Sequence, residues 1–108
     1  MTIAQVVLTQ TQWTPPNPIR LNETSPNPVR AMLTLEYEII VSGNYKIYAS
    51  HMQSSHSILL VEGNDPNLVG AVIKYINTQA WDEGMYAIFI QHEGTLYNSD
   101  HKILKQNP

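Results

Sequence analysis

Apolar and polar residues alternate most regularly between residues 31 and 41. Every second position there is apolar: Leu33, Leu35, Tyr37, Ile39 and Val41. Because successive side chains of a strand point to opposite faces, this pattern predicts a half-buried strand with one wet face. Met32 and Ile40 fall on the wet parity. The following Ser42-Gly43-Asn44 predicts a hairpin turn into a partner strand from Tyr45.

Other segments also have strand character. Residues 2–13 are rich in β-branched side chains and predict a strand with Ile3, Val7, Thr9, Thr11 and Trp13 on one side. The apolar run 57–63 indicates a more buried strand. Glu93-Gly94 predicts a tight turn between strands near 85–91 and 95–104, with His92 opposite Thr95 and Tyr86 opposite His101.

Residues 64–81 carry the signals of a helix. Asp65 is a suitable N-cap, and Pro66 fits the first helical position. The apolar residues that follow have helical spacing: Leu68, Val69, Val72, Ile73 and Ile76. The segment 57–91 thus has the length of a βαβ unit.

These elements predict one α+β domain over residues 1–108. We expect a mostly antiparallel, curled sheet of about five or six strands with a single helix on one face. A single helix covers only one face, so the other must be polar or meet another copy or a partner. Met32, Ile40 and Tyr48 lie on that second face and favour a second packed layer or an oligomer interface. Residues 105–108 are expected to fray.

A proline-rich loop is predicted for residues 14–30, which hold five of the seven prolines. "PNPIR" (16–20) is followed by "PNPVR" (26–30), and the two copies contain both arginines of the chain. Three interpretations stay open. The segment from Pro15 to Pro18 could be a PxxP ligand, or Arg20 and Arg30 could clamp an anion. Alternatively, each Ile/Val-Arg starts a strand and leaves its arginine exposed.

Composition excludes several classes of function. The formal net charge is −3 and only 14% of residues are charged, which argues against a nucleic-acid or membrane-surface partner. The chain has no cysteine, so thiol catalysis, thiolate metal sites and disulfides are excluded. No signal peptide or membrane-spanning apolar run is recognisable, and the expected location is the cytoplasm.

Few residues are candidates for catalysis, metal binding or ligand binding. The four histidines are His51, His56, His92 and His101, and their spacing matches no zinc motif, so surface and loop roles are expected. Ser54, Ser55 and Ser57 surround His56 but lack a nucleophile elbow. No catalytic residue, metal site or cofactor is predicted. The candidate ligand-binding residues are Arg20, Arg30, Tyr48 and His56, with arginines holding an anion and tyrosine stacking on it.

The sequence favours a small non-enzymatic binding or assembly protein. It would resemble an inhibitor or immunity protein in kind, act on another protein or on itself as a homo-oligomer, and suit a phage or bacterial accessory role. One alternative is a protein that binds or sequesters an anionic small molecule, such as a nucleotide or a sugar phosphate. A second is a small hydrolase that uses His56 or His92 as its base.

Overall fold

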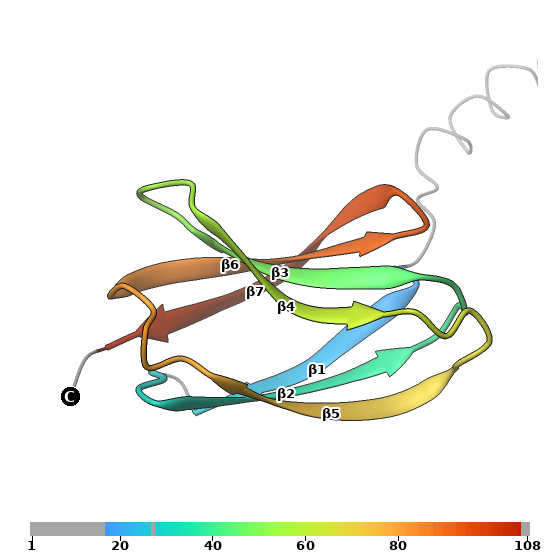
Figure 1. Ribbon diagram of the computed structural model, residues 1–108, viewed down its shortest axis with the longest axis horizontal. Coiled ribbons are helices and arrows are strands. Elements are labelled where there is room, and N and C mark those ends of the chain that lie inside the picture. Colours follow the sequence, from blue (N-terminus) through green and yellow to red (C-terminus); the bar gives the residue numbers. More distant parts are fainter. Residues whose placement is uncertain (1–16, 27, 107–108) are drawn as a thin grey trace, which may run out of the picture.

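The protein is a sandwich of two antiparallel β-sheets. The computed structural model describes residues 17–26 and 28–106. In these residues the strands are β1 (Ile19–Ser25), β2 (Met32–Ile39), β3 (Tyr45–His51), β4 (Ser57–Gly63), β5 (Gly70–Asn77), β6 (Gly84–His92) and β7 (Thr95–Lys105). One sheet has the order β1-β2-β5 and the other the order β4-β3-β6-β7. Figure 1 shows them as two stacked layers.

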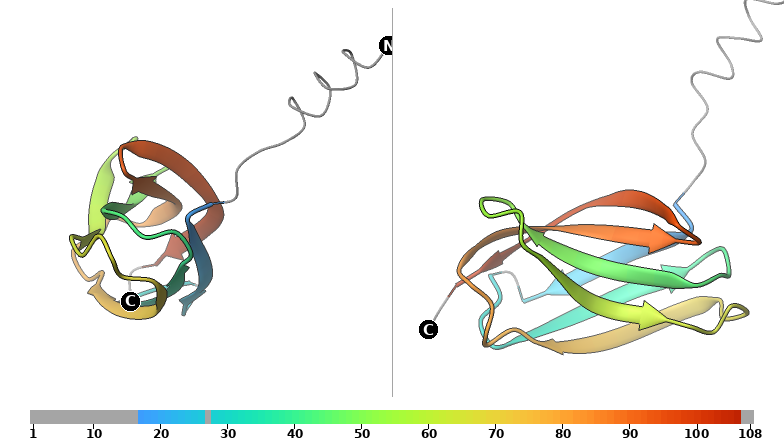
Figure 2. Two further views of the ribbon diagram at one scale, coloured as in Figure 1. Left: turned by 90° about the vertical axis from the view of Figure 1, so that its right-hand side faces the viewer. Right: turned by 45° about the horizontal axis from the view of Figure 1, so that its top comes forward.

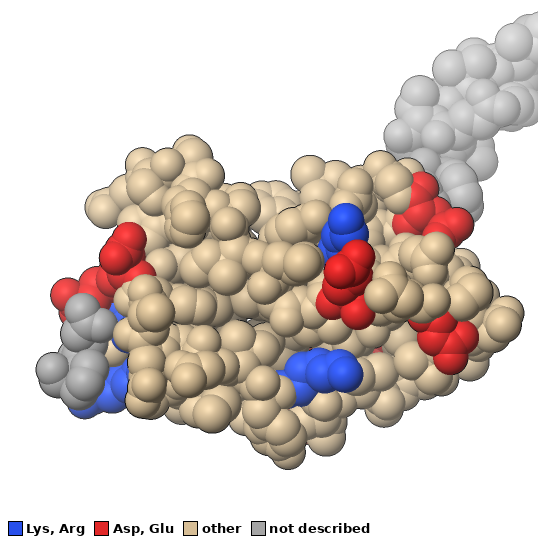
Figure 3. Space-filling view, viewed as in Figure 1, with Lys and Arg blue, Asp and Glu red and all other residues tan. Residues whose placement is uncertain are grey.

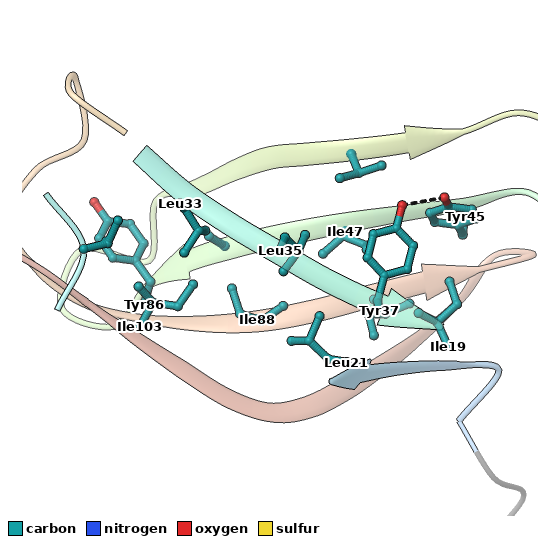
Figure 4. Packing of buried hydrophobic residues seen from close by; sticks show 14 of the residues in the cluster. Ile19, Leu21, Leu33, Leu35, Tyr37, Tyr45, Ile47, Tyr86, Ile88 and Ile103 are labelled. Carbon is teal, nitrogen blue, oxygen red and sulfur yellow. Dashed lines mark hydrogen bonds between the residues drawn. The ribbon is translucent and has the colours of Figure 1, made fainter. Parts of the chain in front are cut away.

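The core lies between the sheets and follows from strict alternation along the central strands. In β2, Leu33, Leu35, Tyr37 and Ile39 are buried, as the sequence predicted. The inward residues of β3 and β6 meet them from the opposite layer, and Figure 4 shows these side chains filling the space between the layers. The core is therefore made by one sheet covering the other.

The order of the strands resembles that of immunoglobulin-like sandwiches. Lettered A, B, C, C′, E, F and G along the chain, the strands form an ABE sheet facing a C′CFG sheet. Tyr86 near the start of β6 donates its hydroxyl to the carbonyl oxygen of Asp82 at 2.7 Å. A tyrosine at this corner, bonded to backbone a few residues upstream, is a recurrent feature of such sandwiches. An architecture of this kind does not by itself define a function.

The predicted α+β class is wrong, because residues 70–77 form strand β5 instead of a helix. Val72, Ile73, Tyr75 and Ile76 are β-branched or aromatic, and pairing with β2 realises their strand preference. Asp65 caps a turn: its carboxylate accepts the amide of Asn67 at 3.0 Å. Apolar residues on both faces of β5 produced a helical spacing by coincidence. The predicted βαβ unit is wrong for the same reason.

The predicted hairpin at residues 42–44 is also wrong. β2 and β3 belong to different sheets, so this connection crosses from one layer to the other. It is held by the β6–β7 turn, where the amide of Asn44 donates to the Glu93 carboxylate at 2.7 Å and the amide of Glu93 donates to the Asn44 carbonyl at 2.9 Å. These partners lie about fifty residues away in the sequence. Local turn chemistry could not reveal them.

The hairpin between β6 and β7 is confirmed, with His92 paired to Thr95. Its far part differs from the prediction, since Tyr86 pairs with Ile103 instead of His101. The register shifts between Ala87 and Phe89, where β7 bulges and Asp100 takes a φ of 63°. Strand β4, predicted to be well buried, is an edge strand in which only Val61 is fully buried.

The segment predicted as a proline-rich loop, 14–30, contains strand β1. Ile19 is buried at its start and Arg20 is exposed, as the architectural interpretation of "PNPIR" expects. Val29 does not start a strand. It is buried and bridges the end of β7, donating its amide to the Leu104 carbonyl at 2.8 Å and accepting the Gln106 amide at 2.9 Å. Lys105, expected in a frayed tail, is buried. The predicted strand 2–13 lies outside the described residues.

Candidate interaction edge

Among the described strands, the two sheets leave four edge strands on the sandwich. β4 and β5 border one side of the molecule, and β1 and β7 border the opposite side, as the end-on view of Figure 2 shows. An edge strand presents backbone N–H and C=O groups that can pair with another chain. Natural sandwiches interrupt such edges with bulges, prolines or charges.

Three of these four edges are interrupted by bulges. Asn22 is the extra residue in β1, because Leu21 pairs with Tyr37 while Glu23 pairs with Glu36. Leu60 is the extra residue in β4, and residues 99–101 bulge from β7. The bridge from Val29 further covers the end of β7. Added strands would meet an irregular backbone at each of these edges.

Strand β5 differs from the other edges. It pairs with β2 through eight consecutive residues without a register shift, from Gly70 opposite Ile39 to Asn77 opposite Met32. No described strand pairs with its other side. Ile73 is 50% exposed and Tyr75 is 71% exposed on its outer face. Lys74 is the single charged residue within the strand. β5 is therefore a long, regular and mostly apolar edge that carries one charge, Lys74; apart from that charge it is the kind of edge that accepts a further strand.

Apolar side chains of the two edge strands on this side are packed against the core but only half buried: Ile58 and Leu60 from β4, and Val72 and Ile76 from β5. Leu68 and Val69 on the preceding connection are exposed as well. Figure 3 views the molecule from this side, where charged side chains are few. We name the free edge of β5, together with these flanking side chains, the β5 edge.

Polar groups near the apolar core are satisfied internally. The hydroxyls of Tyr37 and Tyr45 lie 2.7 Å apart inside the sandwich, and Figure 4 shows them pointing toward each other. Burial raises the pKa of the Tyr37 phenol well above its usual range, and the hydrogen bond with Tyr45 adds to this. Burial, followed by the nearby Asp82, also raises the pKa of Tyr86. Both phenols are buried and are part of the hydrophobic core.

Two histidines predicted to be surface residues are buried, which corrects that expectation. The His51 ring accepts amides of Gln53 and Ser54 at Nδ1, so its Nε2–H donates to the Glu83 carbonyl at 2.9 Å. The Nε2 of His92 lies 3.0 Å from the Val41 carbonyl oxygen. The His51 ring thus fixes the β3–β4 turn, and the His92 ring fixes the β2–β3 connection. The sequence signal was their parity: both continue the inward series of their strands.

The structure does not bring Arg20 and Arg30 together. Arg20 forms an ion pair with Glu38 directly opposite on β2. The Arg30 carbonyl accepts the Thr78 hydroxyl at 3.1 Å, beyond the other end of that sheet. Glu38, opposite Arg20, and Met32 at the other end of β2 are six positions apart, which corresponds to about 20 Å. Arg20 instead lines a hollow between β1 and β7 together with Asn17, Ser99 and His101.

Tyr48 and His56 lie elsewhere. Tyr48 is on the outer face of the four-stranded sheet, where it pairs with Phe89 and Leu59 and lines a small hollow with Ser57. His56 is exposed in the connection before β4, next to that serine. The four predicted ligand-binding residues thus fall in three separate places.

Within the described ranges, no group of three or more His, Asp or Glu side chains is placed to hold a metal ion. The same part of the chain contains no helix able to span a membrane. No protein-family model, curated protein or solved structure matches the chain. The function must therefore be argued from the geometry alone.

Sequence reasoning missed the β5 edge because it assigned these residues to a helix. The signal that could have found it is the run Val72-Ile73-Lys74-Tyr75-Ile76, in which four of five residues favour strands. Its exposure could not be read from the sequence, since a buried strand shows the same run.

Proposed function

We propose that this is a non-enzymatic assembly protein that binds another polypeptide strand at the β5 edge. The observation that carries the proposal is the regular, unbulged pairing of β5 with β2, which contrasts with the three interrupted edges. In β-augmentation, main-chain hydrogen bonds supply affinity and the alternate side chains supply specificity. The cytoplasm suits a chain without cysteine, and an inhibitor-like or accessory role fits this mode of binding.

The side chains of the β5 edge fit this mode on both faces. Ile73 and Tyr75 offer apolar contacts on the outer face of the sheet. Val72 and Ile76 are half buried and offer contacts on the inner face of the sheet. Removing such area from water stabilises a complex by roughly 25 cal/mol per Å² before the cost of association. An added strand therefore gains hydrophobic contacts as well as backbone hydrogen bonds.

The test is to place charge on this edge. Ile73→Lys combined with Tyr75→Lys should lower the mean mass of the full chain to that of a monomer in size-exclusion chromatography with light scattering. Met52→Lys changes an exposed apolar residue in the β3–β4 turn and provides the matched control, which should assemble like the wild type. A wild-type chain that stays monomeric at all concentrations and binds no strand would overturn the proposal.

A second candidate function is the binding of a small anion. The observation in its favour is that Arg20 and His101 line one hollow between β1 and β7. The ion pair with Glu38 neutralises part of the Arg20 charge, so the expected affinity is modest. Inorganic phosphate or a sugar phosphate should then raise the melting temperature of the wild type, and the rise should be lost in Arg20→Gln. Equal melting shifts in both proteins would exclude this site.

A further inference from the structure

We propose that the β5 edge receives residues 2–13 of a neighbouring copy as an added strand, so that copies join head to tail. This inference rests on the proposed function, since it names the occupant of the same edge. It follows from the chemistry of the edge, the composition of the N-terminal sequence and the position at which that sequence joins β1.

The N-terminal sequence suits this edge in composition and length. Residues 1–16 contain no Asp, Glu, Lys or Arg. Their apolar residues fall on both parities of a strand: Ile3 and Val7 on one, Val6 and Leu8 on the other. One set can contact Ile73 and Tyr75, and the other can contact Val72 and Ile76. Twelve extended residues span about 40 Å, which exceeds the roughly 26 Å of β5.

Lys74 disfavours the simplest alternative, a symmetric pairing of two β5 strands. Such a pairing would place both copies of Lys74 on the same face of the junction, a few residues apart. Like charges at neighbouring cross-strand positions are destabilising. The N-terminal sequence has no cationic side chain, and pairing with it avoids this repulsion. Lys74 thereby selects between two partners that otherwise share the same backbone chemistry.

The connection to β1 favours a neighbouring copy over the same molecule. Ile19 pairs with Ile39, which pairs with Gly70, so β1 and β5 begin at the same end of the sheet. The Pro18 carbonyl accepts the amides of both Ile40 and Val41, at 2.8 and 3.0 Å, so residue 18 is still held against the end of β2. Folding back onto its own β5 would require a chain reversal within residues 14–18.

Three prolines lie at that point. Pro15, Pro16 and Pro18 have fixed φ angles, and each proline pushes the residue before it toward extended conformations. This preference for extended backbone favours, in our proposal, insertion into a neighbouring copy. Insertion into the next copy gives a heterologous contact, which closes as a ring or continues as a chain of copies.

Complementation between two full-length variants tests the proposal. Val7→Asp disables the donor strand, and Ile73→Lys disables the accepting edge. Each variant alone should be monomeric in native mass spectrometry. An equimolar mixture should contain dimers with one copy of each variant, and nothing larger, because only one intact donor and one intact edge remain. Circular dichroism and thermal melting serve as controls that both variants are folded.

The outcomes separate this inference from the proposed function. If Ile73→Lys loses assembly while Val7→Asp keeps it, the edge is correct and the proposed occupant is wrong. If the mixture stays monomeric although the wild type assembles, insertion between copies is wrong. If the wild type is monomeric and binds no added peptide strand, both the proposed function and this inference are wrong. As a second measurement, β5 amides should exchange hydrogen at least tenfold more slowly in the wild type than in Val7→Asp.

Discussion

At the scale of single residues, the buried pair of Tyr37 and Tyr45 has consequences for stability. Tyr37 is fully buried, and its ring meets that of Tyr45 edge-on with centroids 5.8 Å apart. Tyr45 also lies over Gly63 on the edge strand β4, where an added Cβ would come within 2.1 Å of the ring. An aromatic ring that covers an edge glycine stabilises the pairing of two strands.

The raised pKa of Tyr37 predicts a loss of stability in alkali. Its ordinary value is 10.0, so the unfolded chain loses this proton near that pH while the folded chain retains it. The stabilisation is thus fully present below pH about 10 and falls as the pH rises further. In Tyr37→Phe, the free energy of unfolding, measured with urea from pH 8 to 11, should fall less steeply.

A matched substitution controls for the loss of one phenol. Tyr75→Phe removes a hydroxyl from a side chain that is 71% exposed, and its alkaline slope should equal that of the wild type. Equal slopes in wild type and Tyr37→Phe would show that this buried phenol does not govern the alkaline behaviour. Tyr86, whose pKa is also raised, contributes to the slope that remains in Tyr37→Phe.

At the scale of elements, the two copies of "PNP[IV]R" have different roles. In the first copy Arg20 pairs with Glu38 on the exposed face of a sheet. In the second copy Val29 is fully buried and closes the end of β7. Similar sequences thus make a strand start in one case and a bridge between two sheets in the other.

The two copies should therefore respond differently to substitution. Arg20→Gln should change the free energy of unfolding by less than about 1 kcal/mol, because exposed ion pairs contribute little. Val29→Ala should cost about 1–3 kcal/mol, because it leaves a cavity in the core. Urea unfolding of both variants checks this, and a larger loss in Arg20→Gln than in Val29→Ala would contradict the assignment.

The helical spacing of residues 68–76 illustrates a limit of pattern analysis at this scale. The edge strand β5 carries apolar side chains on both faces, and this removes the alternation that marks a half-buried strand. The strand–turn–strand from β6 to β7 was predictable because its turn is local. Its bulge was not, since the position of the extra residues depends on packing against the other sheet.

At the scale of the whole molecule, the two sides of the sandwich are unequal. On one side, bulges in β1 and β7 and the bridge of Val29 disrupt or cover the edges. On the other side, β5 is regular and the adjoining core residues are only half buried. This asymmetry is what makes the β5 edge a candidate for assembly, and it exists only once both sheets are in place.

The sequence by itself determined the strands with clear alternation, such as β2, and the local turn between β6 and β7. Alternating burial and turn formation depend on residues only a few positions apart. The local sequence is therefore enough to specify such strands and turns. Tertiary structure decided that Ser42-Gly43-Asn44 crosses between sheets, that residues 70–77 are a strand, and that Arg20 and Arg30 lie apart. Each of these depends on partners far along the chain, whose contacts override local preference.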